Sequence, residues 1–263
     1  MPSLSNVVWF VLIGAELGLL FRLLTSRASK LFPWLTVHTG LAASENILRL
    51  GLYGLVSAGY TTAIRYDGKL YALFEFLLAA ALVAIIRELW LHIAHEHIAL
   101  ARLGSFVVIG AAVGVLAVST VLALAGRNGF AEAAMRMLIT VHSAADGAAA
   151  LFLLVIWMFI LVFPVVLMAN VLAYFRSFLV YYLTEWIVIG IIASWPAQRE
   201  VWNLVLVGAG IASRGYLLLT LCAPDRDESR VSGPADTARA QVLRRRLQYL
   251  DRTAQELLGP FGS

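Results

Sequence analysis

The chain has 263 residues, of which 61% are hydrophobic and 14% charged, and its formal net charge is +4 at pH 7. A mean hydropathy of +0.83 excludes a single water-soluble domain and indicates an integral membrane protein. The one cysteine, Cys222, excludes an intrachain disulfide framework and a CxxC metal or redox motif.

Long apolar segments set the fold class. Only helices and closed barrels satisfy their backbone polar groups within a bilayer, and these segments are too long for barrel strands. The sequence therefore predicts an all-α polytopic membrane protein, in which residues 1–222 form a bundle of seven transmembrane helices and residues 223–263 a tail. The expected spans are residues 5–24, 35–60, 70–92, 103–125, 137–163, 174–194 and 202–222.

The distribution of Lys and Arg predicts the orientation. With the N-terminus outside, most of the basic residues lie on the inner side, chiefly because the tail is rich in arginine. We expect a multi-pass protein of the inner (plasma) membrane, with the N-terminus outside and the C-terminus in the cytoplasm.

Three histidines follow the third expected span, in the stretch "LWLHIAHEHIALARLG" of residues 89–104. At 100° per residue His92 and His95 share a helix face, and His97 lies about 200° away from His95. We therefore predict a polar helix face at the inner membrane surface, solvated or paired with Glu88 and Glu96, in preference to a metal or haem site.

Ionisable residues lie within the expected spans. Each costs about 2.5–3.5 kcal/mol to insert, so it normally faces the bundle interior and has a partner. Glu45 and Arg49 are spaced for an ion pair along one helix. Arg214 needs a carboxylate, and Glu185 is the preferred candidate over Glu16 and Asp146. The sequence predicts an intramembrane polar network of Glu16, Glu45, Arg49, Glu75, His142, Asp146, Glu185 and Arg214.

Depth places part of this network on one side of the membrane. Alternate spans run in opposite directions, so Glu75, His142 and Asp146 all fall in the outer half. We expect a polar cavity open to the outside and lined by the second, third, fifth, sixth and seventh spans. A buried structural network is the alternative interpretation.

Several chemistries have no support in the sequence. The lysines, Lys30 and Lys69, lie outside the spans, so a retinal Schiff base has no attachment point. GxSxG, HExxH and Walker motifs are absent. We predict no catalytic, cofactor-binding or metal-binding residues, and we do not expect an enzyme.

The tail predicts a short amphipathic helix after a polar linker. Leu243, Leu247, Leu250, Ala254 and Leu257 are spaced as one apolar seam about two heptads long. The basic residues beside it, Arg239, Arg244, Arg245 and Arg246, suit anionic lipid headgroups on the inner leaflet. Pairing with a partner protein or a second copy, and a solvated helix, are the alternatives. No nucleic-acid partner is expected.

Two segments carry a resemblance: "LFPWLTVHTGLAASENILRLGLYG" at residues 31–54 and "YALFEFLLAAALVAIIRELWLHI" at residues 71–93. Over residues 5–222 the chain resembles a group of uncharacterised bacterial seven-helix membrane proteins of about this length. The resemblance implies an architecture and no activity, and the basic tail helix is outside it.

The function favoured by these features is a membrane sensor or signalling-type module, in which a ligand or proton acts on the outer polar cavity. A small-solute or proton-coupled transporter is the main alternative, and an accessory subunit of a membrane complex is a third. A transporter needs polar lining at both faces of the bundle, whereas the cavity of a sensor can have an apolar floor.

Overall fold

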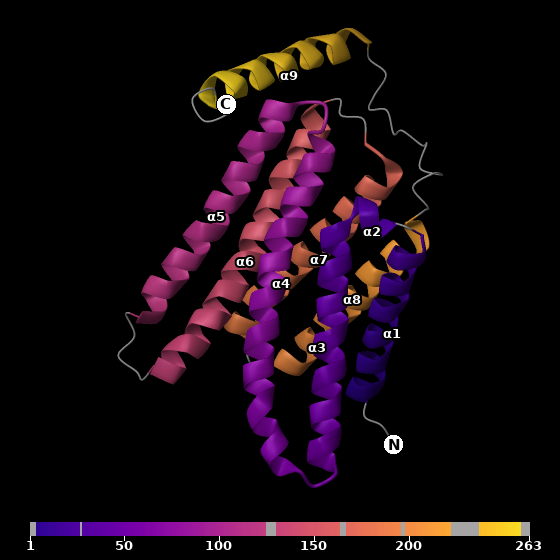
Figure 1. Cartoon of the computed structure of the whole chain (residues 1–263), viewed down its shortest axis with the longest axis vertical. Helices are drawn as coiled ribbons and strands as arrows, with labels where there is room; N and C mark the ends of the chain where they lie inside the picture. Colours follow the sequence, from indigo (N-terminus) through magenta and orange to yellow (C-terminus); the bar gives the residue numbers. More distant parts are fainter. Residues whose placement is uncertain are drawn as a thin grey trace.

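The computed structural model describes residues 4–26, 28–124, 130–163, 167–195, 198–221 and 237–258, and over these ranges it contains helices and no β-strand (Figure 1). This confirms the all-α prediction. The elements are α1 (Leu4–Thr25), α2 (Ala28–Leu31), α3 (Pro33–Ser57), η1 (Thr61–Ala63), α4 (Ile64–Ile93), α5 (Ile98–Leu124), α6 (Phe130–Val162), α7 (Ala169–Ser194), α8 (Arg199–Thr220) and α9 (Thr237–Leu258).

Six of the described helices are long and apolar enough to cross a membrane: α1, α4, α5, α6, α7 and α8. The multi-pass character is therefore supported by length and composition. Helix α3 occupies the second expected span and has 25 residues, but it is not among the six. Because α3 carries His38, Glu45, Asn46 and Arg49, its apolarity is low, and a seventh span remains a prediction.

Contacts between helices arrange six of them in a closed ring, in the order α1, α3, α4, α6, α7, α8 and back to α1. Helix α5 stands outside this ring and packs on α4 and α6. In Figure 1, α1, α3 and α4 run close to the long axis, α5 and α6 tilt away from it, and α9 lies across the end of the bundle. The ring has one interior, and it is the place where buried polar groups can meet.

The half of the ring nearer α9 is filled mainly by apolar and aromatic side chains, with the carboxyl group of Glu88 buried among them. Phe32 packs edge-on against Tyr174, and Tyr174 against Phe178, with ring centroids 5.1 and 4.9 Å apart. We call this region the apolar layer. Its fully buried members include Leu19, Leu23, Phe32, Leu35, Ile85, Leu89, Tyr174, Phe175 and Leu217.

Carboxylates from other helices accept N–H groups at the first turns of α3 and α5. A Glu88 carboxylate oxygen on α4 accepts the Trp34 N–H at 2.9 Å, and an Asp251 oxygen on α9 accepts the Leu100 N–H at 3.0 Å. The first N–H groups of a helix have no partner within it, so both acids satisfy donors that would otherwise need one.

The turn between α4 and α5 is closed by Trp90. Its indole N–H points at the Leu100 and Ala101 carbonyl oxygens, 3.3 and 3.2 Å away, and its ring lies against Gly104. Trp90 is buried, so it acts as a packing residue at this turn. Trp34, by contrast, is exposed.

Candidate functional site: a polar cavity inside the helix ring

A cavity of about 190 Å³ lies inside the ring, next to the apolar layer, and all six ring helices contribute to its wall. We call it the ring cavity. Its polar and ionisable lining residues are Glu16 from α1, His38, Glu45 and Asn46 from α3, Glu75 from α4, Asp146 from α6, Tyr181, Tyr182 and Glu185 from α7, and Arg214 from α8.

Glu16 and Arg214 form the ion pair at one side of the cavity. Glu16 Oε1 lies 3.6 Å from Arg214 Nε, and the Glu16 side chain is only 1% exposed. Asn46 Nδ2 donates to the other Glu16 oxygen at 3.0 Å, and the Trp9 indole N–H donates to Asn46 Oδ1 at 2.9 Å. The side-chain amide of Asn46, itself held by Trp9, therefore fixes the position of the Glu16 carboxylate.

Arg214 is also held by the ring helices themselves. Its guanidinium carbon lies 5.0 Å above the centroid of the Tyr181 ring, within the range of a cation–π interaction, and Nη1 donates to Gly210 O at 3.4 Å. The sequence favoured Glu185 as the acid for Arg214, but the structure shows the ion pair with Glu16. Helix α8 packs on α1 as well as on α7, and this packing brings Glu16 of the first helix to Arg214.

Two tyrosines of α7 form the part of the wall next to Arg214. Tyr181 donates its hydroxyl hydrogen to Glu185 Oε1 at 3.3 Å, and the Tyr182 hydroxyl lies 3.5 Å from His38 Nε2. His38 is buried and packs edge-on against Phe178, with centroids 6.0 Å apart. Beneath these residues only about 20 Å³ of space remains, bordered by the apolar layer. The ring cavity therefore narrows toward α9 to this small space, whose wall includes Thr39 and Ser213 as well as Leu19, Leu35 and Leu217.

Arg49 lies at the edge of the cavity and not in its lining. The expected ion pair with Glu45 is present at 3.5 Å, and Arg49 Nε also lies 3.1 Å from an oxygen of Asp67 on α4. Tyr53 donates to the second Asp67 oxygen at 3.3 Å. This cluster lies toward the α3–α4 turn, where Gly59 has a φ of 99°.

A second, larger space of about 550 Å³ borders the ring cavity on this side, between α1, α3 and α8. We call it the vestibule. It shares Leu12 and Asn46 with the ring cavity and is also lined by Trp9, Arg49, Glu200 and Asn203. The two spaces together make the interior polar on the side of the α3–α4 turn.

Six of the eight residues of the expected network line one cavity: Glu16, Glu45, Glu75, Asp146, Glu185 and Arg214. Arg49 contacts this group of residues through its ion pair with Glu45. The side chain of His142 lies outside the described residues. The expected list lacked His38, Asn46, Tyr181 and Tyr182. The sequence did offer a signal for Asn46. It adjoins Glu45, and a polar amide next to a carboxyl group within a span is also expected to face the interior.

The described lining residues have an excess of acid. Five carboxyl groups and one guanidinium face the ring cavity, and Arg49 reaches Glu45 from the vestibule side. Even with both arginines counted, carboxyls outnumber fixed cations, so the site suits a cationic ligand or protons. Tyr181 and Tyr182 add aromatic surface of the kind that binds alkylammonium groups.

The histidines after α4 do not share one environment. His92 Nε2 lies 3.0 Å from Leu31 O and is half-buried, whereas His95 is exposed and lies 3.9 Å from Glu96. The solvated face expected for all three is therefore wrong for His92, because α2 folds over it. Among the described residues, no group of three or more His, Cys, Asp or Glu could hold a metal ion.

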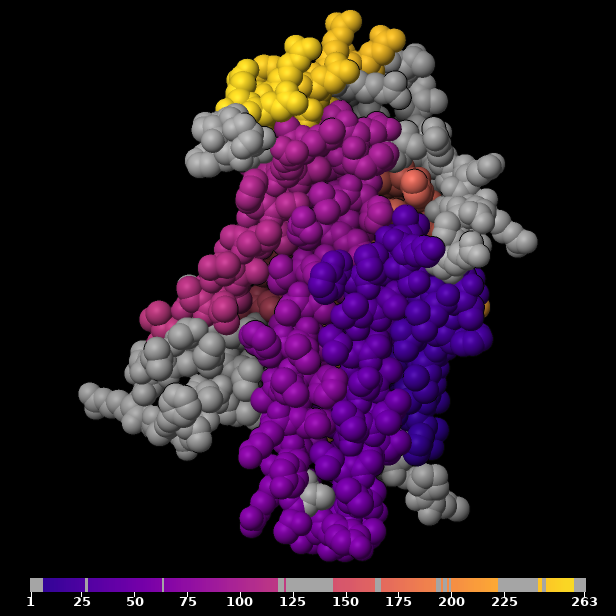
Figure 2. Space-filling view, in the orientation of Figure 1, coloured from indigo at the N-terminus to yellow at the C-terminus, as the bar shows by residue number. Residues whose placement is uncertain are grey.

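Helix α9 packs on α5 through a narrower face than its expected seam. Leu247 and Ala254 are buried, but Leu250 and Leu257 are exposed. Figure 2 shows α9 lying across the end of the bundle. Arg245 and Arg246 are exposed, and the side chains of Arg239, Leu243 and Arg244 lie outside the described residues.

Comparison with protein-family models, with curated proteins and with solved structures finds no match to the chain.

Proposed function

We propose that the protein is a membrane sensor that binds a small organic cation in the ring cavity. The observation that carries the proposal is the one-sided polarity of the ring interior. Five carboxyls line the cavity and the larger vestibule adjoins it, whereas the side of the ring toward α9 is filled mainly by apolar side chains. A sensor needs no polar path through the bundle, so a ligand site that closes toward α9 can serve this function.

Binding of butylammonium to the purified protein in lipid nanodiscs tests the proposal. We expect saturable binding by calorimetry, and about tenfold weaker binding in Glu45→Gln, because one carboxylate that stabilises the cation is lost. Glu96→Gln is the matched control, since Glu96 is exposed and lies outside the ring. Equal binding of butanol and butylammonium, or no binding of either, would contradict a cation site.

A transporter of the same cation is the second candidate, and the surplus of membrane carboxyls favours it. Its site must be exposed to each side of the membrane in turn, so the apolar layer would have to open. The test is uptake of radiolabelled butylammonium into proteoliposomes. Uptake that is abolished by Glu45→Gln would support the transporter and contradict the sensor. Binding without uptake supports the sensor.

The sensor further requires the vestibule to face outward, and we propose the inner membrane with the N-terminus outside. This orientation puts the basic helix α9 against the anionic headgroups of the cytoplasmic leaflet. In a Cys222→Ser background, Lys69→Cys and Arg127→Cys should react with an impermeant maleimide on intact cells. Lys30→Cys and Ser232→Cys should react only after lysis, and the reverse pattern would overturn the orientation.

A further inference from the structure

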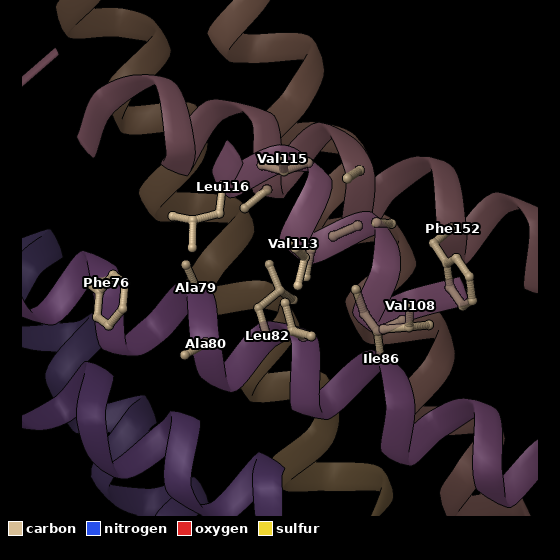
Figure 3. Close-up of a pocket in the computed structure, with 16 residues that line it drawn as sticks. Phe76, Ala79, Ala80, Leu82, Ile86, Val108, Val113, Val115, Leu116 and Phe152 are labelled. Carbon is tan, nitrogen blue, oxygen red and sulfur yellow. The ribbon is translucent and has the colours of Figure 1, made fainter. Parts of the chain in front are cut away.

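An apolar groove of about 330 Å³ lies between α4, α5 and α6, outside the ring (Figure 3). It exists because α5 packs on α4 and α6 without entering the ring, and because seven of the sixteen residues along its wall are alanines. In Figure 3, Phe76 lies near one end and Phe152 near the other, with Leu82 and Val113 between them. The groove has the chemistry of a hydrocarbon-chain site and lacks a polar group for a headgroup.

The groove and the ring cavity share a wall. Ala79 and Leu82 of α4 line both spaces. On α6, Asp146 lines the ring cavity, and its neighbour Ala145 and the following Ala149 line the groove. Ala79, Ala145 and Ala149 each carry only a methyl group, so at these positions the wall between the two spaces is built of small side chains.

We propose that the two spaces form one bipartite site for a single-chain cationic amphiphile, with an ammonium head among the carboxyls and an alkyl chain in the groove. The inference rests on the proposed cation site and names its ligand class. Charge complementarity selects the head, since carboxyls outnumber guanidinium groups in the described cavity lining. The volume of about 330 Å³ and the apolar lining of the groove select a flexible hydrocarbon chain over a compact cation.

Dodecylammonium, butylammonium and dodecanol are the probes, each titrated against the full chain in nanodiscs of one lipid composition. Long chains partition into any bilayer, so affinities are compared between variants for the same probe, which cancels the partitioning. The key variant is Ala112→Phe, because Ala112 lines the groove and a phenyl ring there would occupy the space of several methylene groups. Ala148→Leu fills the same groove by a smaller volume and serves as the second variant.

Ala112→Phe should weaken dodecylammonium binding by about tenfold through the loss of chain contacts, and leave butylammonium binding unchanged. Retained butylammonium binding also shows that the variant is folded. Ala117→Phe is the matched control, because Ala117 is an exposed alanine on the same helix that does not line the groove, and it should bind both amines like the wild type.

The results separate the two proposals. If butylammonium binds but neither groove variant changes dodecylammonium binding, the bipartite site is wrong and the cation site stands. If dodecanol competes with dodecylammonium at equal concentration, the groove binds hydrocarbon chains without help from the carboxyls, and the bipartite site is wrong. If neither amine binds the wild type, the proposed function itself fails.

Discussion

Arg214→Leu is expected to reduce the yield of folded protein in detergent severely. The guanidinium cannot lose its charge in a protein, and Glu16, its partner at 3.6 Å, is almost completely buried. Removing one member of a buried pair typically costs about 3–5 kcal/mol, because the other charge stays behind without compensation. Glu16→Leu should therefore have a similar effect, measured by size-exclusion yield and the thermal unfolding midpoint.

The double variant Arg214→Leu with Glu16→Leu should recover much of the loss, because no charge is left uncompensated. Arg245→Leu is the control for removing an arginine, since Arg245 is exposed on α9. Additive losses in the double variant, or stronger coupling of Arg214 to Glu185 than to Glu16, would show that the pairing in the structure is wrong.

Gly104→Ala should produce the second large loss of stability. A β-carbon at this position would collide with the Trp90 indole, which is buried and faces the Leu100 and Ala101 carbonyl oxygens. Overpacking costs about 1–3 kcal/mol, and a displaced indole N–H that loses its acceptor adds a comparable amount. The thermal unfolding midpoint in detergent measures the effect.

Gly110→Ala is the matched control for this substitution. It lies on the same helix, and an added β-carbon there has no neighbour within 4 Å. Replacing a glycine inside a helix by alanine stabilises it by about 0.5–1 kcal/mol, so Gly110→Ala should be neutral or stabilising. Equal midpoints for the two variants would contradict the packing at Trp90.

The sequence predicts the helices well because each apolar run must satisfy its own backbone bonds in a bilayer. Each of the seven expected spans corresponds to one described helix, although several helices begin earlier. Helix α4 begins at Ile64 rather than near residue 70, and Asp67, expected in the loop, lies in its first turn and contacts Arg49 and Tyr53. These long-range contacts hold the additional turn.

Neighbour relations between helices are harder to predict. Order along the chain suggests that Arg214 meets the preceding span and hence Glu185, but α1 closes the ring against α8 and brings Glu16 to Arg214. The insertion cost of charged groups predicts that such residues face the bundle interior, and six of the eight line one cavity, but this cost does not specify their partners. The neighbours of Trp90 are equally hard to predict, because it is buried only when the turn after α4 brings Gly104 against its ring.

The contact between Asp251 and Leu100 joins residues 151 positions apart. Asp251 is synthesised after α6, α7 and α8, so the first turn of α5 lacks this acceptor until most of α9 has been made. The α4–α5–α6 groove is bounded by that same helix. The packing of α9 on α5 is therefore the last contact that can form around this helix, after α4 and α6 have been synthesised.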